Sequence, residues 1–175
     1  MTVTPPNGLS ERHLAQFGAI VHWFARYECL MQRVMAKASN ADGASVFTMT
    51  KELGFKQKRE ALLNVLRHRG APLDEIDAVR DYLKLPVRLE PLRDDIAHCE
   101  WTTAAREDSV QPSWILRPPT TIKAAHDSPL IDAGVYYEDA DDLAEYTVLE
   151  LAQIAERLEE NYAALRAYLE QVGRV

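Results

Sequence analysis

Cysteine is scarce in this chain of 175 residues, which contains only Cys29 and Cys99 and no C-x-x-C spacing. Two isolated cysteines are too few for a disulfide framework or for a cysteine-based zinc site. Residues 1–9 contain no Lys, no Arg and no apolar run, so a secretory signal peptide is not expected either. These absences favour a reducing, cytoplasmic location.

A long apolar run is also missing. The uncharged stretch from His13 to Ala25 has only about 13 residues, some of them polar, whereas a helix that spans a membrane needs about 20 apolar residues. We therefore expect no membrane association. Apolar residues make up 47% of the chain and charged residues 27%, which is typical of one folded domain. We predict a single domain over residues 1–175, with residues 1–9 as a flexible arm.

The motifs of several large enzyme classes are absent. The chain has no G-x-G-x-x-G, P-loop, H-E-x-x-H or G-x-S-x-G motif, which removes local support for dinucleotide, NTP, zinc-protease and α/β-hydrolase chemistry. A di-iron bundle needs two Glu-x-x-His pairs, and the nearest match is the single Asp95-x-x-His98. The sequence therefore predicts neither a cofactor nor a metal site.

Positive charge is in deficit overall, since the formal net charge is −7, and this argues against a broad nucleic-acid-binding surface. The charge is uneven along the chain, however. Lys51 to Arg69 contains six basic residues and two acidic ones, whereas Glu138 to Glu160 contains nine acidic residues and one Arg. Both segments fit solvated helix faces, and the basic one also fits a docking site for an anionic partner.

Apolar residues at three- and four-residue spacing predict most of the chain to be helical. The expected helices run from Ser10 to Ser39, from Phe55 to Leu66, from Pro72 to about Ile96 and from Thr147 to Val172. Pro86 and Pro91 predict that the third is kinked or divided into two helices. The apolar stripe of the first helix comprises Leu14, Phe17, Val21, Phe24, Met31 and Met35.

A strand and loop insertion over residues 102–146 separates the third helix from the last. Trp101–Thr103 is expected to pair with a strand at Ser113–Arg117 as a small hairpin, and Val135–Tyr137 to form another short strand. Thr147 and Glu150 have the spacing of a capping box, which marks the start of the last helix. The predicted fold is all-α, a four- to five-helix bundle with a small β-hairpin and loop insertion before the last helix.

Arg93, Asp94 and His98 lie together at the end of the third helix and are the candidate catalytic residues. A guanidinium holds a phosphate with fixed geometry, and an imidazole transfers protons near neutral pH. Asp94 is one helical turn before His98, where its carboxylate can fix the imidazole tautomer.

The segment Arg93-Asp94-Asp95-Ile96-Ala97-His98 resembles the R-x(4–6)-H motif of the HEPN superfamily (higher eukaryote and prokaryote nucleotide-binding domains). The resemblance extends over roughly Phe17 to Leu169. It implies a helical bundle that forms a homodimer in the cytoplasm, with RNA or a nucleotide as ligand. It further implies a metal-independent ribonuclease of a toxin–antitoxin or phage-defence system, with an antitoxin or other partner protein. Cys99 and Asp94 depart from the Gly and Asn that are common at these positions.

Helix geometry gives a separate reason for a dimer. Five residues turn through about 500°, so Arg93 and His98 point about 140° apart and a second copy would complete the site. Two alternatives stay open at this point. One is a binding or scaffold bundle without catalysis. The other is a structural pair, with Arg93 bound to Glu28 and His98 bound to Asp94 or Asp95 as a helix-end residue. The tryptophans Trp23, Trp101 and Trp114 fit either core packing or base stacking.

Overall fold

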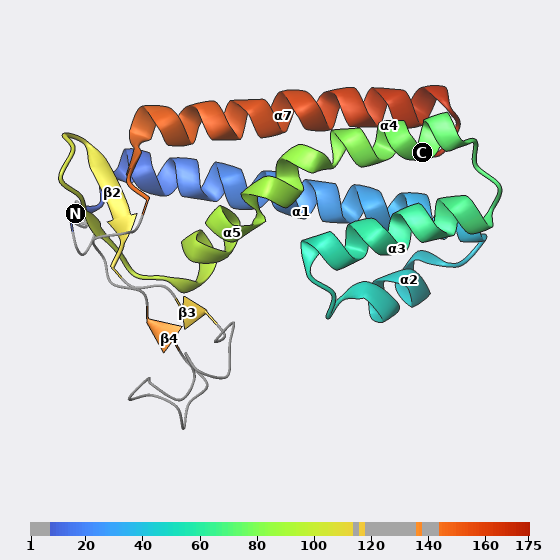
Figure 1. Cartoon of the computed structure of the whole chain (residues 1–175), viewed down its shortest axis with the longest axis horizontal. Coiled ribbons are helices and arrows are strands. Elements are labelled where there is room, and N and C mark those ends of the chain that lie inside the picture. Colours follow the sequence, from blue (N-terminus) through green and yellow to red (C-terminus); the bar gives the residue numbers. More distant parts are fainter. Residues whose placement is uncertain (1–7, 114–115, 118–135, 138–143) are drawn as a thin grey trace. The chain divides into compact units, whose positions relative to one another are not determined.

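The structure is a computed structural model that describes residues 8–113, 116–117, 136–137 and 144–175 (Figure 1). The predicted arm falls almost entirely outside the described residues, as does Trp114. The helices are α1 (Glu11–Ser39), α2 (Gly43–Thr50), α3 (Phe55–His68), α4 (Leu73–Tyr82), α5 (Lys84–His98) and α7 (Val148–Gln171). A small antiparallel sheet precedes α7, which confirms the predicted helical bundle with a β insertion. No described helix is long and apolar enough to cross a membrane.

The β insertion differs from the predicted hairpin in its pairing. Strand β1 (Trp101–Thr103) pairs with β2 (Ser109–Pro112), which in turn pairs with β5 (Tyr146–Thr147). The expected partner at Ser113–Arg117 is therefore wrong. Within that segment, Leu116–Arg117 forms β3, which pairs with β4 (Tyr136–Tyr137). A tight turn decides the pairing, because Asp108 adopts a positive φ of 53° and Ala104 N–H donates to the Ser109 carbonyl at 3.0 Å. No glycine marks this turn in the sequence.

The chain divides into two compact units. Unit 1 comprises Met1–Gly18 and Leu92–Gln153, and unit 2 comprises Ala19–Pro91 and Ile154–Val175. Helices α1, α5 and α7 each contribute residues to both units. The single-domain interpretation stays a prediction.

The core of unit 2 is built around Phe24, Tyr27 and Phe55, all fully or almost fully buried. The Phe55 ring meets the rings of Phe24 at 5.2 Å and Tyr27 at 6.2 Å, both edge to face. The Tyr27 hydroxyl donates to the Leu158 carbonyl oxygen at 3.0 Å and to Asn161 Oδ1 at 2.6 Å. These bonds join α1 to α7 within the unit and satisfy a polar group that would otherwise be costly to bury.

Four residues of the stripe predicted for α1 are buried as expected, namely Phe17, Phe24, Met31 and Met35. Leu14 and Val21 belong to that stripe but are 45% and 39% exposed, so their predicted burial is wrong. The side chains that take their places in the core are Ile20, Tyr27 and Val34. Both sets of residues recur at helical spacing, so the sequence pattern alone could not choose between them.

The third predicted helix is two helices, α4 and α5, separated by Leu83. Pro86 lies in the first turn of α5, where main-chain N–H groups have no partner within the helix, so a proline is tolerated there. Pro91 lies inside α5 and is the last residue of unit 2 before unit 1 resumes. Before Pro91, the Glu90 carboxylate accepts hydrogen bonds from the main-chain N–H groups of Phe55 at 2.8 Å and Lys56 at 3.3 Å, which caps α3.

Helix α7 begins at Val148, as the capping box predicts. Thr147 N–H donates to Glu150 Oε2 at 2.8 Å, and Glu150 N–H donates to Thr147 Oγ1 at 3.2 Å. Leu158, Tyr162 and Leu165 are buried as expected. Ile154 is only half-buried, which corrects the expectation for that position, and Ala155 lies in the core instead.

Arg106, at the β1–β2 turn, donates to both oxygens of Glu150 at 2.9 Å and also contacts Glu145. These bonds, together with the Thr147 N–H, lower the pKa of Glu150 from 4.5 to about 2. A carboxyl group with a lowered pKa stabilises the fold above its unfolded pKa, and this stabilisation is lost as the pH falls toward the folded pKa.

We therefore expect the free energy of unfolding to fall between about pH 5 and pH 2, with Glu150→Gln reducing the slope of that fall. Urea unfolding followed by circular dichroism at several pH values measures it. Glu107→Gln removes an exposed carboxylate of the same turn and is the matched control. An unchanged slope in Glu150→Gln would contradict the assignment.

Candidate functional site

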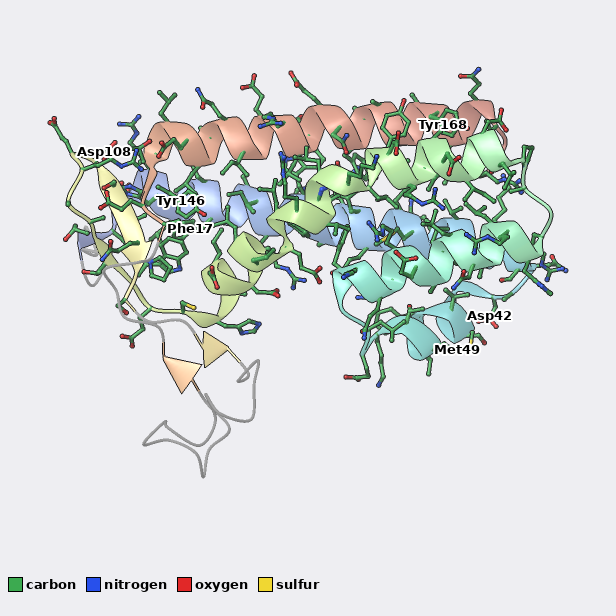
Figure 2. All side chains as sticks on the ribbon, in the orientation of Figure 1. Phe17, Asp42, Met49, Asp108, Tyr146 and Tyr168 are labelled. Carbon is green, nitrogen blue, oxygen red and sulfur yellow. The ribbon has the colours of Figure 1, made fainter. Side chains whose placement is uncertain are left out.

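Trp101, three residues after α5, anchors the candidate site within unit 1. Its ring is only 4% exposed and packs against Phe17 at 4.6 Å and Tyr146 at 6.2 Å between ring centres. Figure 2 labels both partners beside the start of α1 and the last strand. Trp101 Nε1–H donates to the main-chain oxygen of Asp95 at 3.2 Å. The indole therefore fixes the last turn of α5 to the core of unit 1, and it is not available to stack a base.

The main chain around His98 is held on both sides. Before it, the Asp95 carbonyl oxygen accepts a second bond from Cys99 N–H at 2.9 Å. After it, Ser113 N–H and Oγ–H donate to the Glu100 carbonyl oxygen at 2.7 and 3.0 Å. The backbone that carries His98 is consequently a fixed corner between a helix end and a strand.

A second contact ties the β1–β2 turn to the start of α1. His13 is buried, with Nδ1 2.7 Å from Ser10 Oγ and Nε2 3.3 Å from the main-chain oxygen of Asp108. A carbonyl oxygen only accepts, so Nε2 carries the proton and Nδ1 accepts from Ser10. His13 is therefore a satisfied structural residue of unit 1.

Arg93 is largely covered, with 22% of its side chain exposed. Its Nε lies 3.2 Å from Asp94 Oδ1, and the Asp94 side chain is 49% exposed. The Arg93 Nε atom is buried, and its contact with Asp94 is an ion pair and not a hydrogen bond. Glu28 pairs with the buried Lys58 at 2.5 Å in unit 2, and a bond between Glu28 and Arg93 stays a prediction.

His98 is the last residue of α5 and is exposed. Its ring has no hydrogen bond to any residue that the structure describes, so it is not bonded to Asp94 or Asp95 as a structural cap. After burial, the charge of the Asp95 carboxylate contributes to raising the pKa of Tyr146. The imidazole is open to solvent on a fixed backbone.

The site residues are therefore adjacent along α5 without converging. Arg93 and His98 diverge by about 140° on an ideal helix, and the Asp94 carboxylate is directed to Arg93 and not to His98. A single chain presents an exposed imidazole and, separately, a largely covered guanidinium. The sequence identified both side chains, but the role of Trp101 in holding their helix end depends on contacts with Phe17 and Tyr146 that are distant in the chain.

The basic segment from Lys51 to Arg69 does not form one continuous free patch. Lys58 is buried against Glu28, Arg59 pairs with Glu60, and Arg69 donates to the Ser39 carbonyl oxygen at 2.6 Å. Lys51 also pairs with Glu52 at 3.7 Å, and Arg67 donates to Asn64 Oδ1 at 2.6 Å, so five of the six basic side chains are engaged in contacts of their own. The segment gives little support for a docking site.

Within the described residues, no group of three or more His, Cys, Asp or Glu side chains is placed to hold a metal ion. No protein-family model, curated protein or solved structure matches the chain.

Proposed function

We propose that this chain is a HEPN-like, metal-independent endoribonuclease that acts as a homodimer, with His98 and Arg93 as its catalytic residues. The observation that supports it best is the exposed His98 ring, without a partner among the described residues, on a helix end that Trp101 holds in place. A histidine with only a structural role at this position would be bonded to a neighbouring carboxylate.

The reaction would be an internal transfer at one RNA phosphate. The ribose 2′-oxygen attacks phosphorus while His98 takes its proton, and the bond from phosphorus to the 5′-oxygen breaks. The leaving 5′-oxygen takes up a proton, which leaves a 2′,3′-cyclic phosphate and a 5′-hydroxyl. Arg93 stabilises the charge that develops on the nonbridging oxygens, with Asp94 in ion-pair contact with its Nε at 3.2 Å.

Dimerisation would bring together the Arg93 and His98 side chains, which point apart on one helix. A two-fold axis near α5 would bring Arg93 of one protomer toward His98 of the other and form a composite site. By its resemblance to the HEPN superfamily, such an enzyme would act as a toxin or in phage defence and would be restrained by an antitoxin or another partner protein.

A second candidate is a non-catalytic bundle that binds RNA or a nucleotide, or serves as a scaffold. The observation that favours it is the state of Arg93, which is mostly covered and already paired with Asp94. Displacing that carboxylate is a cost that a phosphate ligand would have to offset.

The deciding experiment is cleavage of an RNA panel by the wild-type protein in EDTA. We expect products that end in a 2′,3′-cyclic phosphate, because the nucleophile is the neighbouring hydroxyl and no metal takes part. The same RNAs with 2′-O-methyl groups are the control and should resist cleavage. An RNA panel left intact would reject the enzyme in favour of the binding bundle.

A further inference from the structure

Three basic side chains form a line along the second half of α1, within unit 2. Arg26, Arg33 and Lys37 are all exposed or half-exposed. The seven residues from Arg26 to Arg33 fall about 20° short of two full helical turns, and the four from Arg33 to Lys37 exceed one turn by about 40°. The three side chains therefore leave the helix on nearly the same face. They extend over about 16 Å at 1.5 Å per residue.

Two hollows border this line. The first has a volume of about 310 Å³, and its lining includes Arg33, Lys37, Arg166 and Arg174 together with the Glu170 carboxylate and the last residue, Val175. The second has a volume of about 410 Å³ and is lined by Cys29, Gln32, Arg33, Ala36, Lys37 and Gly43. Both hollows share Arg33 and Lys37, which therefore form a basic ridge between them.

The hydrogen bonds and ion pairs of these cations show which of them lack an acidic partner. Arg166 pairs with Glu170 at 2.8 Å, and Arg174 pairs with Glu75 at 2.7 Å. Among the described residues, Lys37 Nζ donates to a main-chain oxygen of the last residue, Val175, at 3.3 Å. Arg33 makes no ion pair or hydrogen bond with any residue in the described ranges. Within the described residues, Arg33 therefore carries positive charge without a carboxylate partner, on a chain whose net charge is −7.

The end of the line at Arg26 adds aromatic surface. The Arg26 guanidinium lies 5.8 Å from the centre of the Trp23 ring and 5.1 Å from that of Tyr162. Trp23 is half-buried and therefore partly accessible to solvent. Cations in line with an accessible aromatic ring are the usual composition of a surface that binds single-stranded nucleic acid.

We propose that this basic ridge, made of Arg26, Arg33 and Lys37 with Arg166 and Arg174 at its border, binds the phosphodiester backbone of single-stranded RNA. The inference rests on the proposed function in taking RNA as the ligand. A polymer is favoured over a small anion because the cations extend over about 16 Å, beyond what one phosphate group covers. The ridge would hold the strand by charge and would be independent of base identity.

The test measures binding of a fluorescent 12-nucleotide RNA by anisotropy, using His98→Ala protein so that the RNA is not cleaved. Adding Arg33→Ala and Lys37→Ala removes two phosphate contacts, each worth about 0.7 in the salt slope of a single strand. We expect the slope to fall by about 1.4 and the affinity at 0.1 M salt to fall about 25-fold. Lys56→Ala with Arg67→Ala makes the same change of charge on exposed positions of α3 and should alter affinity by less than about threefold.

The proposal would be overturned if the two double variants lost RNA affinity equally or if neither lost any. It would also be overturned if the His98→Ala protein without these changes did not bind RNA. ATP binding that needs Arg33 and Lys37 but is not displaced by RNA would overturn it in favour of a small-anion site. Circular dichroism confirms that each variant is folded. If wild-type protein binds RNA through the ridge but never cleaves it, the ribonuclease is rejected and this inference is kept. If wild-type protein cleaves RNA and the ridge variant binds RNA as tightly as before, this inference is rejected and the ribonuclease is kept.

Discussion

His98→Ala is expected to lower the rate of RNA cleavage by about 10²–10⁴-fold, the usual scale for losing a general acid or base. Fold stability should be nearly unchanged, because the ring is exposed and makes no hydrogen bond with the described residues. Initial rates in EDTA and thermal unfolding of the same preparation measure the two effects. His68→Ala is the matched control, since His68 is also an exposed last residue of a helix, α3.

Arg93→Ala should reduce the rate comparably through the loss of phosphate stabilisation. If the dimer forms composite sites, mixing His98→Ala with Arg93→Ala chains would restore one intact site in each mixed dimer and recover part of the activity. Variants that each cleave at the wild-type rate would remove both residues from the mechanism. If mixed dimers form but no cleavage activity is recovered, Arg93 and His98 do not share a composite site.

Trp101→Ala is expected to cost about 3–5 kcal/mol in the free energy of unfolding, the usual range for removing a large aromatic side chain from a core. The reason is the burial of its ring against Phe17 and Tyr146. Urea unfolding gives the free energy, and amide hydrogen exchange over residues 95–100 reports the end of α5. A cost below about 1 kcal/mol would show that the indole does not anchor this helix end.

Two further variants separate packing from positioning. Trp101→Phe keeps an aromatic ring but loses the bond from Nε1 to the Asp95 carbonyl oxygen. We expect a smaller loss of stability, about 0.5–1.5 kcal/mol for one hydrogen bond, together with faster exchange near His98. Trp23→Ala is the control, because Trp23 is half-buried in unit 2 and should not affect exchange in the last turn of α5.

Local signals in the sequence were sufficient for most helices. The capping box of Thr147 and Glu150 placed the start of α7 correctly because both hydrogen bonds join residues three apart. The spacing of apolar residues predicted α1 and α3 for the same reason, since helical periodicity is a property of the chain itself. Arg93, Asp94 and His98 are neighbours in the chain, so the sequence alone identifies them as a candidate motif.

Tertiary contacts decided what local patterns left open. The face of α1 turned inward depends on helices far away in sequence, which is why Leu14 and Val21 are exposed although their spacing fits a core stripe. The partner of β1 depends on the turn at Asp108, and the covering of Arg93 depends on the packing of the folded chain. The basic ridge combines α1 with residues more than 120 positions later. Periodicity in the sequence fixes which residues share a helix face. Packing between distant segments decides what each face contacts, and this packing leaves His98 accessible.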